Sequence, residues 1–322
     1  MGSLTNRLLS IPIEETLVSR RGFQVRDPAV QLRLEAVGQA FLGGYHAALP
    51  DPGGAALASS LASIDAQLRG FAFEGAGMAL TLLDHLLPMR RGRFPRFLRG
   101  PGAPHIYMLH VGAGWALARL PWLHWRVNSF ISTLDPLARW LALDGYGFHQ
   151  GYFHWPASVR LQQVPRGVAG YARRAFDQGL GRSLWFVQGA DPAGIAAAIA
   201  AFPQSRRPDL WSGLGLACAY AGGLPPSHLE LLREAAGPYL PQVSQGVAFA
   251  AKARARAANP APHTELACSI FCRASAGAAA SVTDDALRDL PPDGVEPAYE
   301  AWRRRIQRHF TFAAQPLPGV LR

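Results

Sequence analysis

The sequence predicts an all-α fold, a solenoid of helical hairpins with about 34 residues per repeat and six to seven units. Three observations lead to this prediction. A Gly-x-Gly pair recurs at nearly equal intervals along the chain. The apolar residues around each pair follow the spacing of a helix face. The segments between the pairs carry signals that start helices, and strand signals are sparse.

The Gly-x-Gly pair marks one helix in each repeat. The first glycines of successive copies are 32, 37, 33, 34, 34 and 33 residues apart. A single pair of this kind is common, whereas a series at near-equal spacing indicates a structural repeat. The copies are GGYHAA from Gly43, GAGMAL from Gly75, GAGWAL from Gly112, GYGFHQ from Gly145, GLGRSL from Gly179, GLGLAC from Gly213 and the degenerate GVAFAA from Gly246.

Glycine inside a helix costs about 1 kcal/mol relative to alanine, so two per repeat must be compensated by packing. A glycine face allows two helix backbones to approach closely and to gain dispersion contacts. Small residues continue this face one turn later in most copies. The GYGFHQ copy differs, because His149 occupies that position.

The segments between the glycine helices predict the second helix of each hairpin. Asp191–Phe202 opens with an aspartate suited to the N-cap, followed by proline. In Pro225–Ala236, Ser227 and Glu230 have the spacing of a capping box. Leu57–Leu68 and Arg126–Leu141 occupy the same place in earlier repeats. Each unit is therefore expected to contain two helices.

The ends of the chain differ from the middle. Residues 1–30 carry no copy of the repeat and are expected to form an N-terminal arm, and residues 31–310 a single repeat domain. Ala301–Phe310 is basic and amphipathic, which predicts a capping helix. The Pro-containing residues 311–322 are expected to be an irregular tail.

The composition is basic and arginine-rich. The formal net charge is +10, and Lys252 is the single lysine. Such a surface attracts phosphates, nucleic acid or an acidic partner. No dense basic tract with interleaved aromatic residues stands out, so we expect no nucleic-acid binding. We interpret the nearest candidate, Met89–Arg99, as a solvated loop between helices.

The N-terminus lacks the pattern of a signal peptide, and no apolar run is long enough for a membrane span. Three cysteines in a chain of 322 residues do not suggest a disulfide framework. These features favour the cytoplasm. No metal site is expected, because His149 and His154 lack an HExxH frame, and no glycine loop fits a cofactor.

The repeat register predicts two rows of side chains on the glycine helices. A mostly polar row precedes the first glycines: Glu74, Val111, Asp144, Gln178, Ser212 and Gln245. A mostly large and apolar row lies four residues later: Met78, Trp115, Phe148, Arg182, Leu216 and Phe249. We expect the two rows of side chains, with Gln178 of the polar row among them, to line either a groove for a long apolar ligand or an interior packed between helices.

The GYGFHQ copy is richest in groups that can transfer protons. Asp144, Tyr146 and His149 lie within the segment Leu143–Trp155 that contains it, and His110 precedes the glycine pair one repeat earlier. With Glu74, these residues are the candidate acid and base groups. The alternative is that His149 is a hydrogen-bonded core histidine among packed aromatic residues.

The chain also carries longer motifs: SRRGF from Ser19, LRGFAFEGAGMA from Leu68, HVGAGWALARLP from His110, LDGYGFHQGYF from Leu143, ARRAFDQGLGRSLWF from Ala172, RRPDLWSGLGLACAYAGG from Arg206 and NPAPHTELAC from Asn259. They resemble a bacterial family of proteins of unknown function, similar to the UnbL-type accessory proteins encoded beside enediyne polyketide synthases, and the resemblance covers about residues 8–310.

The resemblance implies a role in making an enediyne core or a related polyketide, and it carries over no catalytic residue. The implied partners are a polyene or enediyne-core intermediate and an acyl carrier or the polyketide synthase. Two functions stay open: a cofactor-independent enzyme that acts on a bound intermediate, and a non-catalytic scaffold that docks the synthase or its partner enzymes.

Overall fold

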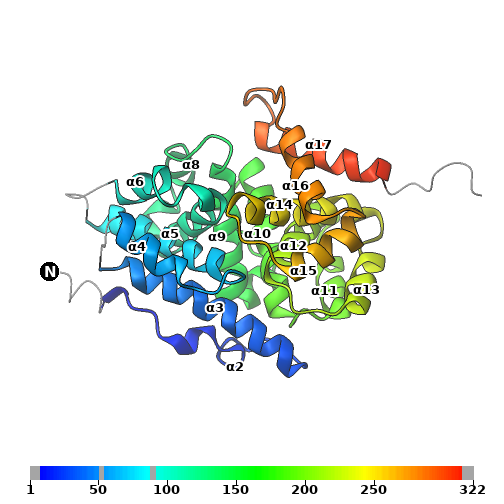
Figure 1. The fold of residues 1–322 in the computed structure, drawn as a ribbon, viewed down its shortest axis with the longest axis horizontal. Helices are drawn as coiled ribbons and strands as arrows, with labels where there is room; N and C mark the ends of the chain where they lie inside the picture. Colours follow the sequence, from blue (N-terminus) through cyan, green and yellow to red (C-terminus); the bar gives the residue numbers. More distant parts are fainter. Residues whose placement is uncertain (1–7, 51–53, 88–91, 314–322) are drawn as a thin grey trace, which may run out of the picture.

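Every regular element in the described part of the chain is helical, and no strand occurs there (Figure 1). The computed structural model describes residues 8–50, 54–87 and 92–313. Within these ranges, sixteen α-helices, α2 to α17, are joined by short 3₁₀- and π-helical turns. The expected all-α fold is confirmed.

Seven long helices correspond to the glycine-bearing copies, and each packs mainly against the one before it and the one after it. Because each copy lies beside the next, the repeat in sequence is also a repeat in contacts. These helices are α3 (Pro28–Ala48), α5 (Arg69–Leu86), α7 (Ile106–Arg119), α9 (Arg139–Phe153), α10 (Tyr171–Val187), α12 (Arg207–Ala221) and α14 (Leu240–Arg256).

The two glycines of a pair face different neighbours. A Cβ atom on Gly112 of α7 would lie 2.0 Å from the carbonyl oxygen of Glu74 in the preceding helix. A Cβ atom on Gly114 would lie 1.8 Å from the carbonyl oxygen of Ala142 in the following helix. The same alternation occurs in α5, α9, α10 and α12. The glycines therefore allow backbone contact on both sides of each helix.

The first copy has a different register from the one expected. A Cβ atom on Gly44 of α3 would lie 1.9 Å from the carbonyl oxygen of Ala72 in α5, so Gly44 is the glycine that faces the next helix. Nothing lies within 4 Å of a Cβ placed on Gly43. In this copy, the two positions that correspond to a Gly-x-Gly pair are therefore Leu42 and Gly44. The copy begins one residue before the expected Gly43.

The shorter helices between the long ones are less regular than expected. They are α4 (Gly54–Ala62), α6 (Arg93–Arg99), α8 (Val127–Ile131), α11 (Pro192–Ala200), α13 (Pro226–Ala236) and α15 (Pro262–Ala267). The segment Arg126–Leu141 is not one helix, because α8 ends at Ile131. Between α9 and α10 there is only a π-helical turn, Pro156–Arg160.

Local capping confirms one sequence prediction and corrects another. The carboxylate of Asp191 accepts a hydrogen bond from the Gly194 amide at 2.9 Å, as expected of an N-cap. Ser227 does not cap α13, because the helix begins at Pro226 and its N-cap residue is Pro225. Because proline occupies the first helical position, the helix begins before Ser227, and the predicted capping box does not form.

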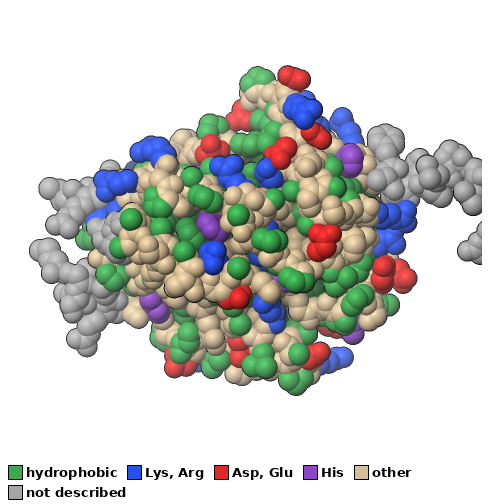
Figure 2. All heavy atoms as spheres, in the orientation of Figure 1, with side chains coloured by type: hydrophobic (Ala, Val, Ile, Leu, Met, Phe, Trp, Pro, Cys, Tyr) green, Lys and Arg blue, Asp and Glu red, His purple; other side chains and the backbone are tan. Residues whose placement is uncertain are grey.

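The interpretation of Met89–Arg99 as a solvated loop was wrong for its second half. Residues 88–91 lie outside the described residues, whereas Arg93–Arg99 forms α6. Phe94 and Phe97 of this helix are buried, and Arg93 pairs with Asp84. Figure 2 shows basic side chains at the edge of the molecule that lies over α6.

Residues 8–27, here called the N-terminal strap, run along α3 and reach the ends of α9 and α10 (Figure 1). Tyr45 Oη donates to the carbonyl of Leu9. Trp155 Nε1 donates to the carbonyl of Arg21, and the Gln24 amide donates to the carbonyl of Val187. The strap includes η1 (Ile13–Thr16) and α2 (Val18–Arg21).

The row of long helices curves back on itself. Arg33 Nε of α3 donates to the carbonyl of Ala221 at the end of α12, at 2.7 Å. Arg254 Nη2 of α14 donates to the carbonyl of Gln67 just before α5, at 3.1 Å. The first long helix is thereby tied to the sixth, and the last to the segment that precedes the second, so that the inner face of the row becomes an interior.

The C-terminal part closes one side of this interior. α16 (Ala276–Asp285) and α17 (Ala298–Ala313) both pack on α14. α17 contains the predicted capping helix Ala301–Phe310 and extends it at both ends. Of the expected tail, residues 314–322 lie outside the described residues.

Candidate functional site

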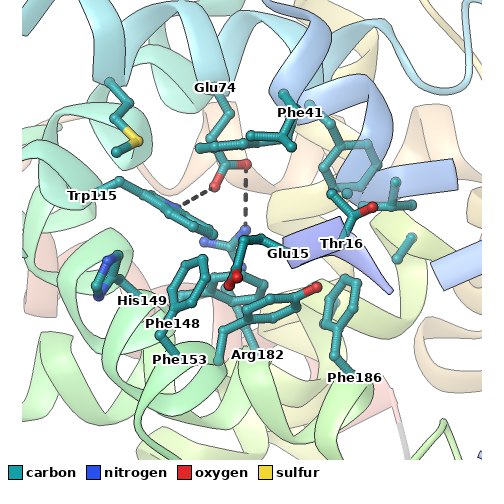
Figure 3. A pocket seen from close by; sticks show the side chains of 18 of the residues that line it. Glu15, Thr16, Phe41, Glu74, Trp115, Phe148, His149, Phe153, Arg182 and Phe186 are labelled. Atoms are coloured by element: carbon teal, nitrogen blue, oxygen red, sulfur yellow. Dashed lines mark hydrogen bonds and ion pairs between the residues drawn. The ribbon is translucent and has the colours of Figure 1, made fainter. Parts of the chain in front are cut away.

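A narrow cavity of about 50 Å³ lies at the centre of the curved row of helices (Figure 3). Side chains from α3, α5, α7, α9, α10 and α12 surround it, and strap residues Ile11, Glu15 and Thr16 cover it. Most of the wall is aromatic or aliphatic. The aromatic members are Phe41, Phe71, Trp115, Phe148, Tyr152, Phe153, Phe186 and Tyr220.

Glu74 of α5 is the fully enclosed carboxyl group of this cavity. Its Oε1 accepts a hydrogen bond from Trp115 Nε1 at 2.9 Å (Figure 3). Its Oε2 lies 3.7 Å from Arg182 Nη2 and has no hydrogen-bond partner in the described structure. One carboxyl oxygen is therefore held in place, while the other is open to a further partner.

Arg182 of α10 connects Glu74 to Asp144 of α9. Arg182 Nη1 forms an ion pair and hydrogen bond with Asp144 Oδ1. The other oxygen of Asp144 accepts from Gln178 Nε2 at 2.8 Å. The guanidinium of Arg182 also lies 4.9 Å from the ring centre of Phe148. Asp144 is thus occupied by Arg182 and Gln178, and Glu74 is the less firmly paired carboxylate.

Burial raises the pKa of Glu74 to about 7, although Arg182 and the bond from Trp115 act in the opposite direction. A carboxyl group in this range exchanges its proton near neutral pH, which suits it to act as both acid and base. A buried carboxyl with a shifted pKa inside a cavity is a typical candidate for a catalytic group.

The raised pKa of Glu74 predicts a pH-dependent stability. The native state binds the proton of Glu74 more tightly than the unfolded chain does. The contribution of this proton to the unfolding free energy is therefore full below the unfolded pKa of 4.5, and it is lost as pH rises through about 7. Relative to wild type, Glu74→Gln should gain about 3 kcal/mol in unfolding free energy between about pH 4 and pH 8. Urea unfolding across this range measures the difference, and a flat difference would contradict the shifted pKa.

His149 of α9 lines the same cavity and stays neutral. Burial lowers its pKa well below the ordinary value, with added repulsion from His154 and Arg119. Its Nδ1 has no hydrogen-bond partner in the described structure, and its ring lies edge-on to Trp115 at 5.5 Å between centres. The free nitrogen of His149 can accept a hydrogen bond inside the cavity, whereas the lowered pKa makes the ring a weak proton acceptor near neutral pH.

The other two candidate acid–base residues lie away from this cavity. His110 Nδ1 bonds to the carbonyl of Ile106 at 2.7 Å, and its ring packs edge-on against Phe94 of α6. Tyr146 lines a separate outer cleft with Trp125 and Gln150, and burial raises the pKa of its hydroxyl to about 12. The structure therefore brings Glu74 and His149 together and joins Asp144 to them through Arg182.

The apolar row converges on the interior. Met78, Trp115, Phe148, Arg182 and Leu216 line the central cavity. Phe249 lines a second, adjacent cavity of about 30 Å³, of which Arg182, Leu216 and Tyr220 form a shared wall. Gln178 lines neither cavity and bonds to Asp144 and to Tyr299 of α17.

The polar row is covered by α17 in its second half. Arg303 pairs with Asp209 at 2.8 Å and donates to Gln245 Oε1 at 3.2 Å, and Ser212 Oγ also donates to that oxygen. The sequence reasoning did not assign this role to Arg303. An arginine on a basic amphipathic helix looks solvent-exposed unless its partner positions are known.

Several cavity residues were also not predicted, although a signal was present. Phe186 follows Arg182 by four residues, and Tyr220 follows Leu216 by four. In α9, Tyr152 follows Phe148 in the same way. Each lies one helical turn beyond the apolar row, on the same helix face. A third row read from the repeat register would have found them.

The described residues contain no group of three or more histidine, cysteine, aspartate or glutamate side chains placed to hold a metal ion. No single helix there combines the length and apolarity needed to cross a membrane. The bent pair Pro262–Cys272 and Ala276–Asp285 meets these criteria by length and composition only.

Neither the curated proteins nor the solved structures with which the chain was compared gave a match. A comparison with protein-family models gave one, and it covers residues 1–310, nearly the whole chain. The protein belongs to the family described as "Protein of unknown function (DUF1702)".

Proposed function

We propose that the protein is an accessory factor of enediyne or related polyketide biosynthesis, and that it encloses part of a linear polyene or enediyne-core intermediate. The observation that carries this proposal is the enclosed aromatic cavity with Glu74 at its wall. The resemblance of the repeat motifs to UnbL-type accessory proteins supplies the pathway.

The cavity walls suit a flat conjugated chain. Phe41, Trp115 and Phe148 form a continuous aromatic contact, with ring centres 4.3 Å apart in the first pair and 5.3 Å in the second. Aromatic rings pack well against other π systems in offset or edge-on arrangements. The rigid walls would hold the chain in one conformation and keep water from it.

The chemistry this site would supply is proton transfer. Glu74, with a pKa of about 7, can give a proton to one carbon of a conjugated chain and remove one from another. Trp115 and Arg182 hold the carboxyl in place, and the free Nδ1 of His149 provides a hydrogen-bond acceptor in the same cavity. The reaction class is isomerisation or cyclisation of the bound chain, with no change in its oxidation state.

Access to the site requires movement. A cavity of about 50 Å³ accommodates a few water molecules rather than a polyene segment. Ile11, Glu15 and Thr16 of the strap form part of its cover. The strap consists of short turns at the surface, which open at lower cost than the long packed helices. We infer that it moves aside when the intermediate enters.

We also infer that the seven long helices are the inner layer of a solenoid of irregular helical hairpins, in the cytoplasm. In support, the glycine pairs of α5, α7, α9, α10 and α12 each contact the preceding and the following long helix. The excess of basic charge suits contact with an acidic acyl carrier or the polyketide synthase, which would deliver the intermediate.

The test is complementation of a producing strain from which this gene alone has been deleted. Wild type should restore the product, and Glu74→Gln should lower it by at least about a hundredfold while a linear polyene accumulates. Glu230→Gln, at an exposed position of α13 outside the cavity lining, is the matched control and should restore the product fully. Circular dichroism and thermal unfolding establish that the variants are folded.

Two results would overturn the proposal in different ways. A deletion strain that makes the normal product would remove the protein from the pathway. Full complementation by both Glu74→Gln and His149→Ala would remove the acid–base role and leave a non-catalytic scaffold that docks the synthase or its partners.

A further inference from the structure

The positive charge of the chain is concentrated in one part of the sequence. Residues 85–176 contain 12 arginines and only two acidic residues, Asp135 and Asp144, whereas the rest of the chain has 20 basic and 20 acidic residues. The whole net charge of +10 therefore lies in these 92 residues. Arg93, Arg139 and Arg174 pair with carboxylates outside this range, and the asymmetry that remains favours an anionic partner for the region.

Two connecting segments of this region lie side by side on the surface. Residues 119–126 lead from α7 to α8, and residues 154–166 lead from α9 towards α10. A cleft of about 360 Å³ is lined by residues of both segments, including Trp125 and Arg166. The guanidinium of Arg166 lies 5.9 Å from the ring centre of Trp125. We call these two segments the Trp/Arg surface.

The Trp/Arg surface exposes large apolar side chains beside cations. Trp122 is 53% exposed, Trp125 70% and Leu161 69%. Arg126, Arg160 and Arg166 are exposed, neither segment contains an acidic residue, and within the described residues none of these arginines is in an ion pair. Exposed tryptophan and arginine together are typical of protein-binding sites, where they supply much of the affinity.

The surface borders the central cavity. Arg119, the first residue of the surface, also lines that cavity. The side chains of His124 and His154 are close enough to the cavity residue His149 to lower its pKa. A protein bound here would stand beside the strap, where we infer that the intermediate enters.

We propose that the Trp/Arg surface docks an acidic protein domain. The carboxylates of that domain pair with Arg126, Arg160 and Arg166. One of the domain's apolar side chains enters the cleft beside Trp125. The location follows from charge and exposure alone. The identification of the docked domain as the acyl carrier of the polyketide synthase rests on the proposed function.

The experiment titrates the full-length protein into a fluorescently labelled carrier domain of an enediyne polyketide synthase at low salt. The double variant Arg126→Glu/Arg166→Glu should bind at least about tenfold more weakly, and wild-type binding should weaken as salt is added. Arg273→Glu/Arg308→Glu is the matched control. It reverses two exposed arginines outside residues 85–176 and should bind within about twofold of wild type.

The remaining measurements distinguish failure of the docking surface from failure of the proposed function. Equal binding by wild type and Arg126→Glu/Arg166→Glu would overturn the docking surface and leave the proposed function standing. Binding of an unrelated acidic carrier protein through these arginines, without binding of the synthase domain, would support the surface and contradict the proposed pathway. Arginine-dependent binding of duplex DNA or of phosphatidylglycerol vesicles, but of neither carrier protein, would overturn an acidic protein as the partner.

Discussion

Alanine in place of Gly44 is expected to destabilise the protein by about 3 kcal/mol or more. The new Cβ would lie 1.9 Å from the carbonyl oxygen of Ala72, where no atom fits. α3 and α5 would have to separate along their contact. Urea unfolding followed by circular dichroism measures the loss, and a variant that fails to express as folded protein agrees with it.

The neighbouring Gly43 provides a matched control within the same helix. It is exposed, and nothing lies within 4 Å of an added Cβ atom. Gly43→Ala should therefore stabilise the protein by up to about 1 kcal/mol, because alanine has the higher helix propensity. Equal effects at Gly43 and Gly44 would contradict the close contact between α3 and α5.

Arg182→Met is expected to cost about 3–5 kcal/mol, because it leaves Asp144 as a buried charge without its cation. Arg182 and Asp144 are both almost completely buried, and Glu74 would also lose its nearest positive charge. For a domain of this size, the loss corresponds to a fall in Tm of roughly 4–7 °C. Differential scanning calorimetry at neutral pH measures it.

The double variant Arg182→Met/Asp144→Asn tests the cause. It removes both charges, so a large part of the lost stability should return. Gln178 can still donate its hydrogen bond, now to the amide oxygen of the asparagine that replaces Asp144. A double variant that is no more stable than Arg182→Met would show that Arg182 acts by packing alone.

The repeat could be predicted from sequence because its cause is local. The Gly-x-Gly spacing reports which helices touch, and the structure confirms those contacts at Gly112 and Gly114. The position of His149 in a small-residue slot was also visible in the sequence. These features depend only on register along one helix and on the identity of its neighbours.

The closed interior could not be predicted in the same way. Whether a row of helices stays open or curves back depends on small crossing angles added over seven helices, which no residue encodes alone. The cover of the polar row by Arg303 and Tyr299 depends on where α17 returns along the fold. The separation of Tyr146 and His110 from Glu74 follows from the same three-dimensional arrangement.

The bonds that close the row imply an order of assembly during synthesis of the chain. Successive long helices are separated by about 34 residues, so each can pack soon after it leaves the ribosome. The bonds from Arg33 to Ala221 and from Arg254 to Gln67 join residues 188 and 187 positions apart. They form only when α12 and α14 have been made. A nascent chain would therefore have its glycine contacts early and a sealed cavity last.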